Sequence, residues 1–114
     1  MKIQVMQQGD LQVVGLSGEL DYHASPELRG KLGELIAKQS PKILVDLSGV
    51  DYMDSSGIAT FVEAFQKTKR YQGRLVLAAL TASVRGVFEI AKLDSIFEIT
   101  GTVAEAVTRL GAKA

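Results

Sequence analysis

The chain has 114 residues, 46% hydrophobic and 23% charged, and its 13 Lys and Arg balance its 13 Asp and Glu. Zero net charge excludes the clustered basic surface of a nucleic-acid binder. The absence of cysteine excludes disulfides, thiol nucleophiles and Cys-ligated metal sites, and the single histidine excludes multi-His metal sites. The length and aliphatic content predict one domain, residues 1–114, with no cofactor or metal.

The first predicted element is a β-hairpin. Apolar residues alternate with polar ones at residues 3–5 and again at residues 11–16, and a Gly-Asp pair at residues 9–10 supplies the turn between them. Residues 18–21 close the second strand.

A first helix follows, with Ser25 as its predicted N-cap and Pro26 at its first helical position. Helical spacing predicts a buried stripe made by Leu28, Leu32, Leu35 and Ile36. Pro41 ends the helix. The aliphatic run at residues 42–47 lacks alternation, which predicts a strand covered on both faces, and a loop of small and acidic residues is expected at 48–57.

A second helix comes after this loop. Its predicted apolar face consists of Ile58, Phe61, Val62 and Phe65. Gly73 is the predicted left-handed cap near its end, and residues 75–80 are predicted to form another buried strand.

The last elements are a helix, a short strand and a final helix. Thr81 is predicted to cap the first of these helices, and its apolar face is Val84, Val87, Phe88 and Ala91. Residues 96–99 are a short strand. Thr102 and Glu105 form a capping box for the final helix, which Gly111 ends.

The predicted element order is therefore ββαβαβαβα. Alternating strands and helices require right-handed crossovers and a largely parallel sheet, to which the opening hairpin adds an antiparallel edge. The fold class is α/β: one small domain with a mixed sheet of about five strands and about four helices.

Functional residues of open α/β sheets gather at the carboxyl ends of the strands. Two loops in these positions have a distinctive composition, residues 18–23 and residues 51–57. The second places two hydroxyls and two carboxylates at a helix entrance. From composition alone, capping of the helix by Asp54, Ser55 or Ser56 is the commoner role for such residues.

The same loop carries a family resemblance. Residues 46–57, DLSGVDYMDSSG, resemble the signature of STAS domains, specifically of bacterial anti-sigma factor antagonists. Residues 18–21, GELD, look like the family's motif after its second strand. Residues 87–93 and 96–99 are similar to its penultimate helix and last strand. The resemblance covers nearly the whole chain in the expected order.

The resemblance implies that Ser55 is a phosphate acceptor. It implies a partner that is both an anti-sigma factor and a serine kinase. The unmodified antagonist binds this partner and frees the sigma factor, phosphorylation ends the interaction, and a PP2C-type phosphatase restores the binding form.

The resemblance further implies that partner contacts surround the acceptor. Asp21, Tyr22 and His23 are expected to border the same surface, with an ordinary polar loop as the alternative. Asp54 either caps the helix or orients the acceptor hydroxyl in the kinase, and both roles stay open.

Ser56 and Gly57 complete the predicted partner-contacting residues. The Ser56 hydroxyl is expected to bond the backbone rather than accept phosphate, and Gly57 either lets a partner backbone approach closely or is structurally neutral. Two residues depart from the family pattern, because Ala59 and Lys92 stand where glycine is common. A left-handed backbone at Lys92 costs about 1 kcal/mol.

Two other functions compete with this hypothesis. Ser55, His23 and a carboxylate offer the members of a hydrolase triad, but the chain has no G-x-S-x-G elbow. A STAS module that binds partners without phosphorylation stays open as the alternative.

The remaining expectations concern location and assembly. The chain shows no signal-peptide pattern, and its apolar runs are far shorter than the ~20 residues of a spanning helix. We therefore expect a cytoplasmic protein with no membrane partner, and the balanced charge predicts a monomer.

Overall fold

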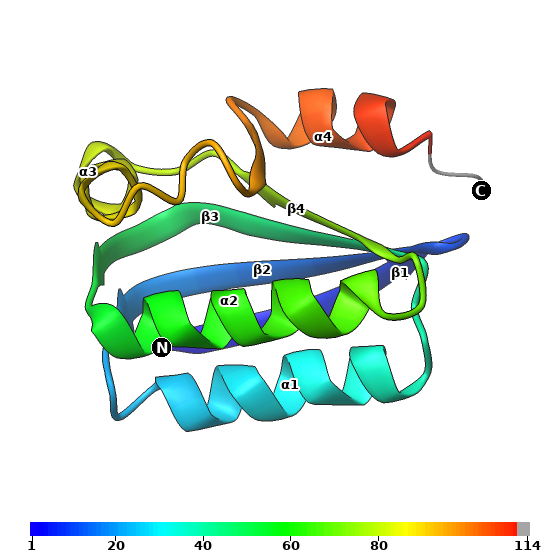
Figure 1. The fold of residues 1–114 in the computed structure, drawn as a ribbon, viewed down its shortest axis with the longest axis horizontal. Helices are drawn as coiled ribbons and strands as arrows, with labels where there is room; N and C mark the ends of the chain where they lie inside the picture. Colours follow the sequence, from blue (N-terminus) through cyan, green and yellow to red (C-terminus); the bar gives the residue numbers. More distant parts are fainter. Residues whose placement is uncertain (112–114) are drawn as a thin grey trace.

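The structure, a computed structural model, describes residues 1–111 and arranges them around a mixed sheet (Figure 1). Within that range the five strands are β1 Lys2–Gln8, β2 Leu11–Leu20, β3 Lys42–Met53, β4 Arg74–Ala78 and β5 Glu98–Thr100. The helices are α1 Ser25–Ala37, α2 Ser55–Lys69, α3 Ala82–Ile90 and α4 Val103–Leu110. The strands lie in the order β1-β2-β3-β4-β5, with β1 antiparallel to β2 and the other neighbours parallel. The predicted element order and the mostly parallel sheet are confirmed.

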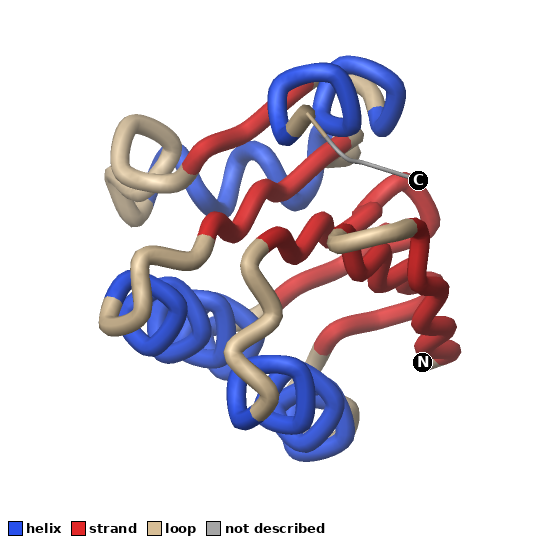
Figure 2. Tube along the Cα trace, turned by 90° about the vertical axis from the view of Figure 1, so that its right-hand side faces the viewer, coloured by secondary structure: helices blue, strands red, loops and turns tan. Residues whose placement is uncertain are grey.

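Helices cover both faces of the sheet. Figure 2 shows α1 and α2 together on one side of the strands and α4 on the other. The strand β3 serves both sides: Ile43 and Val45 belong to the larger hydrophobic cluster with α1, α2 and α3, whereas Leu44 belongs to a smaller cluster under α4. Successive side chains of a strand point to opposite faces, so the aliphatic run is confirmed as a strand covered on both faces.

β3 is longer than predicted and includes most of the residues expected to form a loop. It continues to Met53, and its last part pairs with the end of β2, where Leu20 lies opposite Met53. Val50 and Met53 are buried in the larger cluster. Pairing with β2 and burial therefore keep this segment extended, although its composition is that of a loop.

The start of α1 also differs from the prediction. Ser25 is not the N-cap, because the preceding residue, Ala24, is the N-cap and already has helical backbone angles. The Asp21 side chain instead accepts hydrogen bonds from the N–H groups of His23 and Ala24, at 3.1 and 3.0 Å. Since this turn satisfies the N–H groups before the helix, the Ser25 hydroxyl is left to face inward, and Pro26 becomes the second helical residue.

Two predicted caps and one predicted helix end are confirmed. The side chain of Thr81 accepts a hydrogen bond from the N–H of Val84 at 3.4 Å, and that of Thr102 accepts one from Glu105 at 3.0 Å. Gly111 is left-handed at the end of α4, with φ 59°. Local side-chain chemistry was sufficient to predict these positions.

Three predicted boundaries are wrong. The left-handed residue after α2 is Gln72, with φ 60°, rather than Gly73. β4 ends at Ala78 rather than residue 80, because Ala79 takes a left-handed conformation with φ 59°. The last strand starts at residue 98 rather than 96, because the N–H groups of residues 96 and 97 bond the carbonyl of Leu93 in a turn.

Candidate functional site

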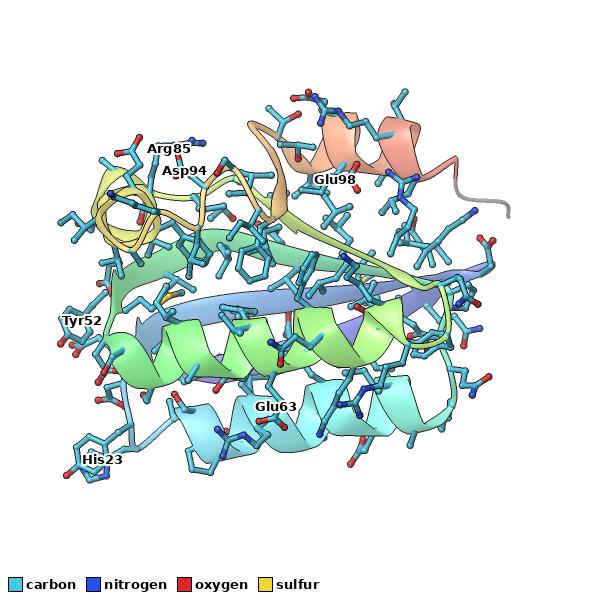
Figure 3. The ribbon with its side chains drawn as sticks, viewed as in Figure 1. His23, Tyr52, Glu63, Arg85, Asp94 and Glu98 are labelled. Carbon is cyan, nitrogen blue, oxygen red and sulfur yellow. The ribbon has the colours of Figure 1, made fainter. Side chains whose placement is uncertain are left out.

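The two loops singled out in the sequence lie next to each other. They follow β2 and β3, which are parallel neighbours, so both loops emerge at the same edge of the sheet. In Figure 3, His23 from the first loop and Tyr52 from the end of β3 project at this edge. The Asp54 N–H donates to the carbonyl of Leu20 at 3.3 Å, which joins the second loop to the first.

Ser55 is the first residue of α2 and is exposed. Among the described residues, we find no hydrogen-bond partner for its side-chain hydroxyl. The first N–H groups of a helix lack intrahelical partners, and the helix dipole places partial positive charge there. Ser55 therefore offers a nucleophilic oxygen to solvent at a position that tolerates an added anion.

Asp54 is the N-cap of α2. Its Oδ1 accepts from the Ser56 N–H at 2.9 Å and from the Ser56 hydroxyl at 2.5 Å, and its Oδ2 accepts from the Tyr22 N–H at 3.2 Å. The hydrogen bond from the Ser56 hydroxyl, helped by the N–H groups of Ser56, Gly57 and Tyr22, lowers the pKa of Asp54 below its usual 3.8, against the opposing effect of desolvation. The capping role is confirmed, and an orienting role toward an acceptor hydroxyl stays a prediction.

The Ser56 hydroxyl faces the interior of the site. It donates to Asp54 and lies 2.8 Å from the hydroxyl oxygen of Ser25 at the start of α1. The prediction that it bonds the backbone is wrong, because these two side chains are closer partners. Ser55 and Ser56 are thus neighbours in sequence with opposite surroundings, one exposed and one bonded on both sides.

Gly57 is buried against the chain's own side chains. A Cβ at this position would lie 2.7 Å from the Met53 Cγ and 3.0 Å from the Leu20 side chain. Gly57 is therefore not structurally neutral, and close approach of a partner backbone at this position stays a prediction. Glycine here lets the first turn of α2 pack onto the ends of β2 and β3.

The other predicted contact residues belong to the first loop, which the Tyr22 N–H joins to Asp54, the residue before Ser55; their contact with a partner stays a prediction. Asp21 is half-buried and holds the turn described above, whereas Tyr22 is 67% exposed and His23 is exposed. The two rings stack with their centroids 4.1 Å apart. Tyr52, which we did not single out, is 48% exposed at the end of β3 and adds a third ring to this edge.

The surface beside these rings is acidic. A shallow cavity next to the first loop is lined in part by Glu19, Asp21, His23, Glu27 and Asp51. Within residues 1–111 we find no group of three or more side chains suited to hold a metal ion, nor a helix with the length and apolar character to cross a membrane. The site is thus an exposed surface that carries aromatic rings, carboxylates and the Ser55 hydroxyl.

The fold and site define a small α/β protein that presents an exposed serine directly after the N-cap of a helix. The chain belongs to the STAS domain family, whose model matches residues 2–106. Its curated relatives include the anti-sigma-B factor antagonist of Bacillus subtilis, 37% identical over 93 residues that cover 82% of this chain and 84% of that protein. The anti-sigma-B factor antagonist of Listeria monocytogenes is 34% identical over 90 residues, 79% of each chain.

Solved structures of similar proteins share the fold. An anti-sigma factor antagonist from Mycobacterium paratuberculosis has a TM-score of 0.89 at 25% identity, covering 96% of this chain and 93% of that one. The Bacillus cell fate determinant SpoIIAA in its phosphorylated form has a TM-score of 0.77 at 27% identity, covering 96% of this chain and 99% of that one.

Proposed function

We propose that the chain is an anti-sigma factor antagonist whose binding is switched off by phosphorylation of Ser55. In this proposal the unphosphorylated form binds an anti-sigma factor that is also a serine kinase, and the sigma factor is released. The kinase then phosphorylates Ser55, and a PP2C-type phosphatase restores the binding form. The observation that carries the proposal is the exposed Ser55 hydroxyl, without a partner among the described residues, at the start of α2. The names of the relatives support it.

The geometry supports a modification that leaves the antagonist folded. A phosphoryl group adds about −1.5 to −2 charges, and free N–H groups and the helix dipole at the start of α2 favour such an anion. Because Ser55 is exposed, the group would enter solvent rather than the core. The modified domain is therefore expected to keep its fold.

The same charge is expected to act on the partner. Asp51 and Asp54 already make the surroundings of Ser55 acidic, and the pKa of Asp54 is lowered further by the hydrogen bond from the Ser56 hydroxyl. A partner surface matched to a neutral hydroxyl would meet an excess of negative charge after phosphorylation. A loss of ~3 kcal/mol weakens binding about a hundredfold.

Ser55 is assigned as an acceptor and not as a nucleophile of hydrolysis. The His23 ring stacks on Tyr22, and within residues 1–111 we find no hydrogen bond from it to Ser55. We therefore propose a regulatory protein without catalytic activity of its own. We also propose that it acts as a cytoplasmic monomer.

Phosphorylation with a cognate anti-sigma factor kinase and ATP tests the proposal. Intact mass and peptide mapping should show one phosphate at Ser55, none in Ser55→Ala, and still one in Ser56→Ala, which removes the neighbouring hydroxyl. Binding of the kinase should be retained by Ser55→Ala and weakened about a hundredfold by Ser55→Asp.

Two outcomes would contradict the proposal. Equal affinity of Ser55→Ala and Ser55→Asp for the kinase removes the switch. Tight binding of an anti-sigma factor without any phosphate transfer supports the alternative, a STAS module that binds partners without modification.

A further inference from the structure

Ser25 is a buried polar residue that the site described above does not account for. It lies at the first position of α1, is only 4% exposed, and is not the cap of that helix. Its hydroxyl oxygen is 2.8 Å from the carbonyl oxygen of Asp21 and 2.8 Å from the hydroxyl oxygen of Ser56. Ser25 therefore touches both loops of the site.

The protons of this cluster can be counted. The Ser56 proton goes to the Asp54 carboxylate, so the contact between the two serine oxygens needs the Ser25 proton. The Ser25 proton is therefore shared between two acceptors, the Asp21 carbonyl oxygen and the Ser56 hydroxyl oxygen, each 2.8 Å from the Ser25 oxygen. In this arrangement the Ser56 hydroxyl donates to Asp54 and accepts from Ser25.

This arrangement fixes the backbone on both sides of Ser55. On the amino side, Asp54 is joined to the first loop through Leu20 and Tyr22. On the carboxyl side, Ser56 is joined to α1 through Ser25. Ser55 lies between these attachments, and its own hydroxyl is left exposed.

We propose that Ser25 is a positioning residue for the Ser55 acceptor, an inference that rests on the proposed function. Acting through Ser56, it holds the start of α2 against α1 and keeps the Ser56 hydroxyl turned inward. The kinase is then offered one hydroxyl, in one place, although two serines are adjacent in the sequence.

A mutant cycle with the full chain tests this role. Ser25→Ala should lower kcat/KM for phosphorylation of Ser55 about fivefold, as expected for one lost hydrogen bond. Ser56→Ala should have a similar effect, and the double variant should lose no more than the larger single loss, because both changes break the same contact. Ser40, just beyond the other end of α1, is 7% exposed, so Ser40→Ala is a control of similar burial that should leave kcat/KM unchanged.

A second readout needs no kinase. Amide hydrogen exchange of Tyr22 and Ser56 should become faster in Ser25→Ala than in the parent chain, while Ser40→Ala leaves both amides unaffected. Independent, additive losses in the cycle, or unchanged exchange at both amides, would overturn the role of Ser25. A parent chain that takes no phosphate contradicts the proposed function instead, and the exchange measurement then decides the positioning role alone.

Discussion

The starts of α2 and α3 are built in the same way and end in different surfaces. Each follows a parallel strand, and each has an extended N-cap residue whose side-chain oxygen accepts a helix N–H. At α3, Thr81 also donates to the carbonyl of Val50 at 2.8 Å, and the first helical residue is Ala82. At α2, the cap is a carboxylate, and the next residue is a serine with an exposed hydroxyl. A cap is thus ordinary at both helices. What differs is the position of the exposed serine, which directly follows a carboxylate cap at α2 and stands one residue further on, at Ser83, in α3.

The largest expected difference between the two helices is the change in the free energy of unfolding when a glycine in each is replaced by alanine. Gly57→Ala should lower the free energy of unfolding by about 2 kcal/mol, because the new Cβ is forced against Met53 and Leu20. Gly86→Ala in α3 should raise it by about 0.5–1 kcal/mol, since a Cβ there meets nothing within 4 Å and alanine is the better helix former. Denaturant unfolding of both variants measures the contrast, and effects of the same sign would contradict it.

The two N-caps, Asp54 and Thr81, should contribute similarly to the free energy of unfolding near neutral pH and differently at acidic pH. Asp54→Ala and Thr81→Ala should each cost about 1 kcal/mol, as N-cap losses do. The folded-state pKa of Asp54 lies below its unfolded value of 3.8, so its contribution is complete above that value and is lost as the pH falls through the folded pKa.

Unfolding free energies measured between neutral pH and pH ~2 separate the caps. The deficit of Asp54→Ala relative to the parent chain should shrink on acidification, whereas that of Thr81→Ala should stay constant because threonine does not titrate. A constant Asp54→Ala deficit would show that the carboxylate is not favoured by the fold.

The smallest expected change in stability concerns the C-terminal ends of α2 and α3, which have the same backbone conformation. Gln72 follows α2 and Lys92 follows α3, and both are left-handed, with φ 60° and 59°. Glycine adopts this conformation without the Cβ penalty, so Gln72→Gly and Lys92→Gly should each stabilise the fold by up to about 1 kcal/mol. Thermal unfolding should show two additive increases, with phosphorylation of Ser55 unchanged. A loss of stability in either variant would contradict this assignment.

The features predicted correctly from sequence depend on neighbours close in the chain. Apolar spacing identified the helices and strands, and the threonines at 81 and 102 identified two caps. Composition and position after a strand also identified the two segments that lie together at the carboxyl ends of β2 and β3. Of the two departures from the family pattern, Lys92 has the left-handed conformation for which we estimated a cost of about 1 kcal/mol, and Ala59 is exposed on α2.

The features that were missed depend on contacts between distant segments. β3 continues through residues 48–53 because β2 pairs with it there. Ser25 and Ser56 are 31 positions apart, and nothing in either neighbourhood indicates that their hydroxyls meet. The sequence around Gly57 likewise does not indicate that this residue packs against Leu20. Contacts between segments distant in the chain leave no periodic pattern in the sequence from which they could be predicted.

The alternation of β3 between two hydrophobic clusters limits how this sequence can change in length. Deleting or inserting one residue just before Ile43 would exchange the sides of Ile43, Leu44 and Val45, so that each cluster received side chains shaped for the other. The hairpin turn at residues 9–10 is less constrained, because its residues belong to neither cluster, provided that a change there keeps the pairing of β1 with β2. Length variation in evolution should therefore concentrate at that turn and avoid the central strand.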